Sequence, residues 1–302
     1  MILGMLLVTP LFAKNLTNPH KPSISVVFST QDPVPGGAAD EHFTSFGNPA
    51  INDFNHVAYL ATVSNLSSRI GNPPAMTADT QTKTWSGIWA DDIMGKRKLV
   101  VRTLTTTSPF PMLGGNGFKT LSDPVYNNSE TLAFIGTWYS DSYSFTDTFH
   151  GGTGVWTSKN LTQPVAFVGQ PTPVAPGVVN TFLRPIGYVP PAFDSFIQIA
   201  LPDQGGVVIW ANVLPGHVAG DTPATQKGIF AQDTLGRLQP VAIEGDTLLV
   251  GGSNKTIATL SFMSSSNSVG AQTRHFSQYT GNILYTATFT DGSQAAIKVQ
   301  FP

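Results

Sequence analysis

The stretch Asn52-Asp-Phe-Asn-His-Val-Ala-Tyr59 indicates the fold, because a related pattern returns three more times along the chain. Each copy begins with a polar side chain, and an aromatic side chain follows at the eighth position. The later copies begin at Asn127, Asp203 and Gln278, at spacings of 75, 76 and 75 residues, and their aromatic positions are Phe134, Trp210 and Tyr285. A regular period of this length predicts an array of units that pack on one another.

Further strand-like elements follow each pattern in a constant order. A Gly-aliphatic-aromatic element comes next, as in Gly87-Ile-Trp89, and then a run of aliphatic residues, as in Leu99-Val-Val-Arg102. An element such as Phe43-x-x-Phe46 precedes the pattern. Gly, Pro and Asn bound these short runs, as is usual for strands joined by turns. Three or four strands per unit are typical of a propeller blade, so we predict an all-β, four-bladed β-propeller with repeats of about 75 residues.

The aliphatic element is missing after the last repeat, and a matching element lies at the start of the chain. Ser23-Ile-Ser-Val-Val-Phe28 leads into Gln31-Asp-Pro-Val-Pro-Gly36, which parallels Val165–Gly177. We predict that this element joins the C-terminal blade and closes the ring, so that no sheet edge stays exposed. The same order of elements would also allow this strand to close the ring of a neighbouring molecule. The residues of this ring-closing strand are Ile24, Val26, Val27 and Phe28.

The composition limits the function classes. The chain has 302 residues, 11% charged residues and a net charge of -2, so no basic surface suggests a nucleic-acid partner. It has no cysteine, which excludes a disulfide scaffold and thiolate metal sites. Four repeats fill residues 21–302, which we expect to form one domain.

Residues 1–20 form an apolar N-terminal extension. Its first thirteen residues are too short to span a bilayer, and they resemble a secretion signal only in part, because no Lys or Arg precedes the apolar run. The extension is therefore either a retained signal or an assembly strand that joins a neighbouring subunit. The apolar side chains in question belong to Ile2, Leu3, Met5, Leu6, Leu7, Val8, Leu11 and Phe12.

The repeats resemble bacterial choice-of-anchor tandem-repeat proteins of the NxxGxxAF type. The matching residues include Asn127 through Phe134, Gly154-Val-Trp156 and Glu244-Gly-Asp246, and the similarity extends from about residue 23 to 301. The resemblance implies a secreted or surface-displayed protein with propeller-like blades. It does not indicate an enzymatic reaction. The family often carries a C-terminal sorting anchor, whereas this sequence ends at Pro302 without one, so we expect attachment through other subunits instead.

Chemistry-bearing motifs are scarce. The sequence has no nucleophile elbow, no His-Glu-x-x-His and no EF-hand spacing, and its six histidines lack ligand spacing, so we expect no metal and no cofactor. Asp91-Asp92 and Glu244 with Asp246 are carboxylates that a propeller glycosidase would need on one face. We interpret them as turn residues, so a glycan-active hydrolase or lyase is only an alternative.

Long connections between the strand that begins with the polar residue and the Gly-aliphatic-aromatic strand mark one face of the array. They run from Ser64 to Trp85, from Trp138 to Gly152 and from Leu214 to Lys227. Insertions on one face of a repeat array often mark an interaction surface, so Trp85, Trp138 and Tyr139 are candidate ligand residues. The recurrent aromatic residues are interpreted as packing residues between blades. Possible glycosylation sites are Asn15, Asn65, Asn160 and Asn254.

Together these features predict a non-enzymatic, extracellular structural or interaction protein of a bacterial surface. The sharper hypothesis is a homopolymer or filament whose protomers are linked head to tail through the N-terminal segment. The alternative from another class is a carbohydrate-binding, lectin-like propeller that recognises surface glycans through the long connections. Neither hypothesis requires a nucleic acid or a membrane span.

Overall fold

The protein is built from β-strands throughout the described part of the chain. The computed structural model describes residues 26–30, 32–65, 84–103, 117–139, 152–173, 187–203, 206–262 and 282–300. Within these ranges the chain forms strands and turns and contains no helix, which confirms the expected all-β fold.

The strands form four main sheets, each made from one stretch of sequence. The first sheet contains β1 (Glu41–Phe46), β2 (Ala50–Ile51), β3 (Val57–Asn65), β4 (Thr84–Asp91) and β5 (Arg97–Arg102). The second contains β6 (Gly117–Leu121), β7 (Val125–Tyr126), β8 (Leu132–Tyr139), β9 (Gly152–Thr157) and β10 (Ala166–Phe167). The third contains β12 (Ala192–Ala200), β13 (Val208–Leu214), β15 (Gln226–Gln232) and β16 (Leu238–Ile243). The last contains β17 (Thr247–Val250), β18 (Ser253–Ser261), β19 (Ile283–Phe289) and β20 (Gln294–Val299). A small pair, β11 (Tyr188–Val189) and β14 (His217–Val218), lies beside the third sheet.

The main sheets repeat one antiparallel order, which confirms the predicted succession of elements. Position one is taken by β1, β6, β12 and β18, position two by β3, β8, β13 and β19, and position three by β4, β9, β15 and β20. Position four is taken by β5, β10 and β16, and among the described residues the last sheet has no strand there. A bulge in the pairing follows the equivalent residues Phe43, Phe118, Phe193 and Ile257.

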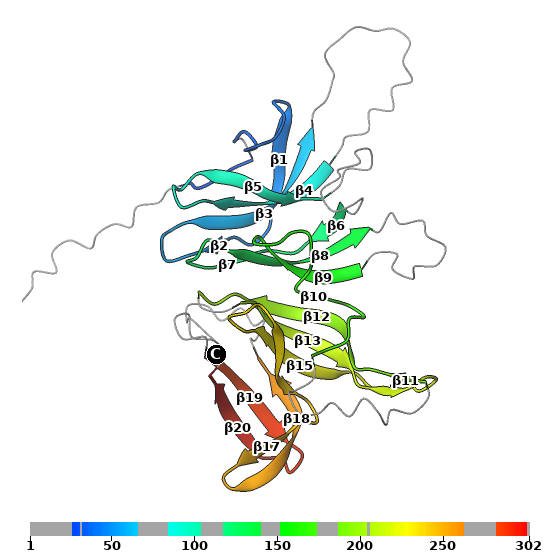
Figure 1. The fold of residues 1–302 in the computed structure, drawn as a ribbon. Helices are drawn as coiled ribbons and strands as arrows, with labels where there is room; N and C mark the ends of the chain where they lie inside the picture. Colours follow the sequence, from blue (N-terminus) through cyan, green and yellow to red (C-terminus); the bar gives the residue numbers. More distant parts are fainter. Residues whose placement is uncertain are drawn as a thin grey trace, which may run out of the picture.

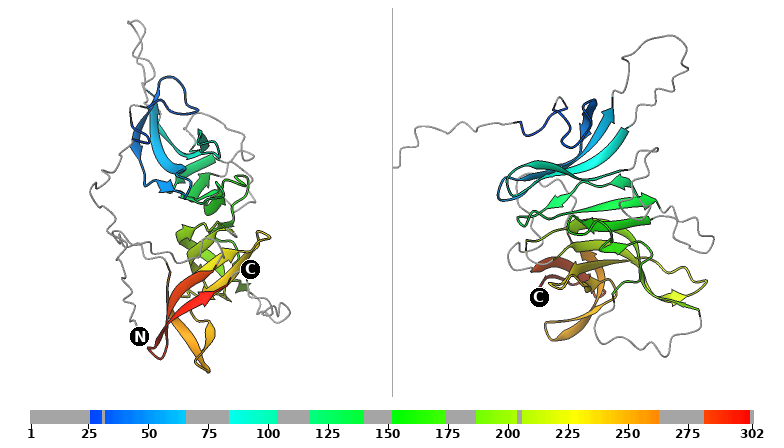
Figure 2. Two further views of the ribbon diagram at one scale, coloured as in Figure 1. Left: turned by 90° about the vertical axis from the view of Figure 1, so that its left-hand side faces the viewer. Right: turned by 45° about the horizontal axis from the view of Figure 1, so that its top comes forward.

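The four sheets follow one another in a row from the first to the last (Figure 1). Figure 2 shows the same succession from two further directions. Because the first and last sheets lie at opposite ends of this row, the described residues do not form a closed ring. The described ends of the β3–β4, β8–β9 and β13–β15 connections lie on one side of the row, as the repeat predicts (Figure 1).

Equivalent residues of successive units hydrogen-bond to one another along the row. Asn52 donates from Nδ2 to the carbonyl of Asn127 at 3.2 Å, and Asn127 donates from Nδ2 to the carbonyl of Pro202 at 2.9 Å. Beside this pair, the backbone N–H of Asn128 donates to Oδ1 of Asp203 at 2.6 Å. Each bond joins residues 75 positions apart, so residues one repeat period apart are in contact in the folded chain.

These bonds correct the predicted register of the third repeat by one residue. Pro202, and not Asp203, is equivalent to Asn127, so the packing position that follows is Ile209. Ile209 is fully buried opposite Phe230, as Phe134 is opposite Trp156. The prediction that Trp210 occupies this position is therefore wrong. A shift by one residue turns a strand side chain to the other face of the sheet, and Trp210 packs toward the last sheet instead.

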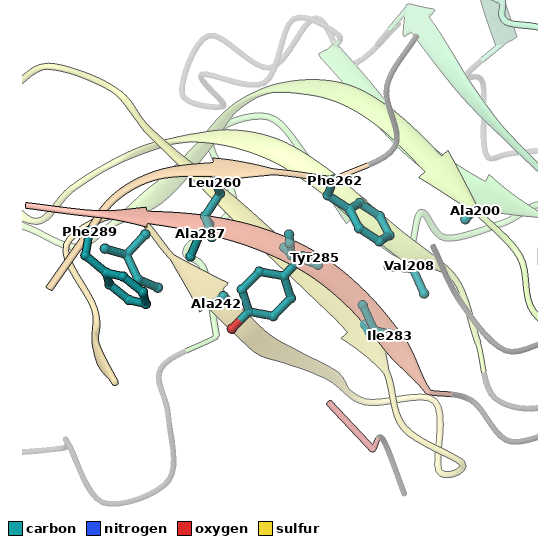
Figure 3. Close-up of a cluster of buried hydrophobic side chains, with 12 residues drawn as sticks. Ala200, Val208, Ala242, Leu260, Phe262, Ile283, Tyr285, Ala287 and Phe289 are labelled. Carbon is teal, nitrogen blue, oxygen red and sulfur yellow. The ribbon is translucent and has the colours of Figure 1, made fainter. Parts of the chain in front are cut away.

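The core lies in layers between the sheets. Where two sheets meet, the face with the large side chains belongs to the later sheet, and it packs on the small aliphatic residues of the sheet before it. Between the third and last sheets, the ring of Tyr285 in β19 lies beside Ala242 of β16, and Ile283 of β19 lies beside Val208 of β13 (Figure 3). This stacking of unlike faces confirms that the recurrent aromatic residues are packing residues.

Candidate functional site at the two ends of the sheet row

One long edge of the last sheet is open. Among the described residues β20 pairs only with β19, whereas its equivalents β4, β9 and β15 each lie between two strands. An unpaired strand presents a row of N–H and C=O groups that can accept another strand. In the other sheets that place is filled by β5, β10 or β16.

The outer face of the last sheet is exposed and mixed in character. Leu284 is 44% exposed, whereas its equivalents Ala58 and Ala133 are fully buried under the following sheet. Thr286 and Lys298, at positions that are largely aliphatic in the other units, are also exposed. A polar outer face is usual for a terminal repeat, so apolar burial on this face alone would be small.

The other end of the row is covered by described residues between Val26 and Pro35. The ring of Phe28 stacks on that of Tyr59, with centroids 4.1 Å apart, and the carbonyl of Pro35 accepts a hydrogen bond from Nε1 of Trp89 at 2.9 Å. This cover leaves Tyr59 and Trp89 without solvent exposure. Burial raises the pKa of Tyr59 to about 12, so its phenol stays neutral at physiological pH.

Arg97 of β5 fixes this segment in place. Its Nη1 donates to the carbonyl of Val27 at 2.8 Å, and its Nε donates to Oδ1 of the buried Asp91 at 3.0 Å. Its guanidinium also lies 5.8 Å from the ring centroid of Phe28. The segment nevertheless keeps an open side, because Val26 is 80% and Val27 is 48% exposed.

The predicted ring-closing strand is therefore not observed on the last sheet. Val26, Val27 and Phe28 form no strand in the described structure, and Phe28 contacts the first sheet. Ile24 and the whole N-terminal extension, from Ile2 to Phe12, lie outside the described residues. The physical reason for the difference is that no described sheet precedes the aromatic face of β3 and β4, so Phe28 covers it.

Of the candidate ligand residues, Trp85 and Trp138 have described side chains, and both pack against other residues of their sheets. Trp85 is only 4% exposed, and its indole N–H donates to Oε1 of Glu41 at 2.9 Å, so this prediction is corrected. Trp138 packs edge-on against Trp156, with ring centroids 5.1 Å apart. Tyr139 ends β8, and its side chain lies outside the described part.

Of the possible glycosylation sites, Asn160 and Asn254 are exposed in the structure. The side chain of Asn65, at the end of β3, and the whole of Asn15 lie outside the described part. Asn127 also begins an Asn-x-Ser/Thr sequence, but it is buried, and Oδ1 accepts the N–H groups of Ser129 and Thr131. Asn127 is therefore a structural residue.

The candidate catalytic carboxylates are divided between two sites and act as turn residues. Asp92 lies in the first sheet, where Oδ1 accepts the N–H groups of Met94 and Lys96. Glu244 and Asp246 line a pocket of about 370 Å³ beside the third sheet. Both oxygens of Glu244 accept backbone N–H groups, and Oδ2 of Asp246 accepts the N–H of Ile243 at 2.8 Å. Burial raises the pKa of Asp246.

The remaining site classes find no support in the described ranges. No group of three or more His, Asp or Glu side chains there is arranged to hold a metal ion. No helix in those ranges is long and apolar enough to cross a membrane. Sequence reasoning missed Arg97, because its signal is only an arginine six residues after Asp91, and its bond to Val27 spans 70 residues.

Comparison with known proteins yields one match. A model described as "Family of unknown function (DUF7453)" matches residues 11–299, nearly the whole chain. No curated protein and no solved structure matches the chain.

Proposed function

Because the chain belongs to the DUF7453 family, whose function is unknown, we propose a function from its own geometry: it is a structural protein whose copies join head to tail. One observation carries the proposal. Among the described residues the last sheet lacks a fourth strand, and the segment with the sequence of that strand lies at the opposite end of the row. A surface and its complement at opposite ends of one molecule make a heterologous contact, which produces an open row of copies when the rotation between copies does not close a ring.

The N-terminal extension adds apolar area to this contact. Residues 26–30 alone offer only a few backbone hydrogen bonds, each worth about 1 kcal/mol net, which is too little to hold two chains together. The apolar residues between Ile2 and Phe12 supply the burial that the polar outer face of the last sheet does not. The protein is thus a protomer of a homopolymer linked through its N-terminal segment.

The proposal places the polymer outside the cell, at a bacterial surface, without enzymatic activity. The resemblance of the repeats to choice-of-anchor proteins supports the surface location, and the absence of catalytic motifs from the sequence favours a non-enzymatic role. The alternative functions have weaker support: Trp85 is buried, which disfavours a lectin face, and the carboxylates of Asp92 and Glu244 bind backbone amides, which disfavours a glycan hydrolase.

The closed four-bladed propeller is the intramolecular form of the same contact. In that form the last sheet of the chain would reach its own residues 26–28. The two forms differ in mass, so one experiment distinguishes them.

Light scattering during gel filtration tests the proposed function. The full chain should form species of increasing mass as its concentration rises from about 1 to 100 μM, and a variant lacking residues 1–20 should remain a monomer. A full chain that stays a monomer over this range contradicts the proposal. Assemblies of unchanged mass in the truncated variant would show that the extension plays no part.

A further inference from the structure

We propose that β20 of one copy accepts residues 26–30 of a second copy as its fourth strand, in a register that the chain itself displays twice. The inference rests on the proposed head-to-tail function and identifies its contact atoms. Chains that lack a strand are commonly completed by strand addition from a neighbour.

Residues 26–29 are followed by the same turn that follows the fourth strands β10 and β16. The N–H of Phe167 donates to the side chain of Gln170 at 3.1 Å, and the N–H of Gln170 donates to the carbonyl of Phe167 at 3.0 Å. Ile243 and Asp246 make the same two bonds after β16. Ser29 and Asp32 make them as well, at 2.6 and 3.2 Å. Residues 26–29 therefore correspond to a fourth strand, although they pair with no strand among the described residues.

The turn continues to the next sheet in each case. Pro171 bridges to Ala192 at the start of β12, and Pro33 bridges to His42 in β1. Residues 32–34 therefore contact the first sheet in the same way as the chain that follows β10 contacts the third sheet. In the later units a fourth strand of this kind belongs to the sheet before the one that its turn contacts. Residues 26–29 would therefore belong to a sheet that precedes the first sheet.

The register follows from the backbone bond next to the turn. The N–H of Val168 donates to the carbonyl of Thr153 at 2.9 Å, and the N–H of Glu244 donates to that of Lys227 at 2.9 Å. The residue equivalent to these donors is Thr30, and the equivalent acceptor in β20 is Gln294. Thr30 of one copy should therefore donate to the carbonyl of Gln294 of the next, and Ser29 should lie opposite Ala295.

A second copy fits this place better than the chain's own last sheet. Three sheet-to-sheet interfaces separate residues 26–30 from β20, and packed sheets are about 10 Å apart. Folding the chain back would require the sheets to change their arrangement, and the bonds from Asn52 to Asn127 and from Asn127 to Pro202 hold the first three sheets in the present one. A second copy instead continues the series of interfaces, and Phe28 keeps its contact with Tyr59.

Disulfide trapping between two single-cysteine variants tests the contact. The chain has no cysteine, so Ser29→Cys and Ala295→Cys can be prepared separately and mixed. The positions next to a hydrogen-bonded pair are about 4.5 Å apart between Cα atoms in antiparallel strands, which a disulfide can span. Under mild oxidation the mixture should give a covalent dimer. Ser29→Cys mixed with Ala296→Cys is the matched control, because these side chains point to opposite faces of the sheet.

The outcomes separate the inference from the proposed function. A dimer of Ser29→Cys with Ala295→Cys, identified by mass spectrometry, supports the register, and an equal or higher yield of dimer with Ala296→Cys overturns it. Assemblies of the full chain without either dimer overturn this contact and leave the proposed function standing. If the full chain is a monomer by light scattering, both fail. A doubly substituted chain that forms only an internal disulfide points to the closed propeller and overturns the inference.

A proline substitution provides a test without cysteine. Thr30 occupies the second position of the Ser29–Asp32 turn, where proline is well tolerated, and Thr30→Pro removes the N–H donor alone. Thr30→Ala keeps the donor. Thr30→Pro should weaken assembly about tenfold relative to Thr30→Ala, with both monomers equally resistant to urea. Equal assembly of the two variants would overturn the expected bond between Thr30 and Gln294.

Discussion

The side-chain amide of Asn127 donates a hydrogen bond to the backbone carbonyl of Pro202, 75 residues further along the chain, at 2.9 Å. Asn127 is 4% exposed, and its Oδ1 also accepts the N–H groups of Ser129 and Thr131. One side chain thus forms its own turn and connects the second unit to the third.

Replacing Asn127 by Ala should lower the free energy of unfolding by about 2–4 kcal/mol, because three backbone groups lose their bonds and two of them belong to the buried residues Thr131 and Pro202. Asn160→Ala is the control, since Asn160 also caps a turn but is exposed, and it should cost less than about 1 kcal/mol. Urea denaturation measures both. Equal losses in the two variants would show that the contact between units adds nothing.

Arg97→Lys should weaken assembly without unfolding the chain. Lysine cannot reach Asp91 and Val27 together, because it lacks the planar fork of arginine. We expect the dissociation constant of the assembly to rise about tenfold, which is about 1.4 kcal/mol. Arg237→Lys alters a similar pair with Asp233 in the third sheet and should leave assembly unchanged. Sedimentation velocity gives both constants, and equal constants would contradict the role of Arg97.

Stability should fall in acid partly through Asp92. The side chain of Lys98 and the N–H of Lys96 lower the pKa of Asp92 to about 2. An unfolded aspartate has a pKa of about 3.9, so the unfolded chain binds more protons between these values. The stabilisation is therefore complete above about pH 4 and is lost as the pH falls toward about 2. As the pH falls, the urea midpoint of Asp92→Asn should decline less steeply than that of the parent. Asp221→Asn, at an exposed position, should decline as steeply as the parent. A parallel decline in all three chains would contradict this assignment.

Gly228 and Phe230 should be energetically coupled. A Cβ at Gly228 would lie 2.7 Å from the ring of Phe230, so Gly228→Ala should cost about 1–3 kcal/mol. The last repeat has Ala295 and Ile297 at these positions, so an alanine occurs there together with a side chain that has no ring. In a Phe230→Ile background the cost of Gly228→Ala should therefore fall by at least half. A double-mutant cycle measured with urea tests this, and additive losses would exclude the coupling.

The repeat allowed the strand elements to be predicted, because alternating side chains and Gly-x-aromatic elements are local signals. The error at Trp210 arose where Val207, Val208, Ile209 and Trp210 form a continuous apolar run. Alternation is lost in such a run, and the register was visible only from the bond between Asn127 and Pro202.

The ends of the row were harder to predict. The match between Gln31–Gly36 and the later turns agrees with the turn bonds that Ser29 and Asp32 share with Phe167 and Gln170. The sequence could not show which sheet they touch, because the contacts with Tyr59 and Arg97 depend on how the units are arranged in space. Local patterns specify strands, whereas the open edge of β20 is a property of the whole row.

Electron microscopy of the purified full chain tests head-to-tail assembly most directly. Head-to-tail joining predicts linear rows with a repeat of roughly 40 Å along the axis, since each copy contributes four layers about 10 Å apart. Discrete particles of single-chain size at every concentration would contradict it.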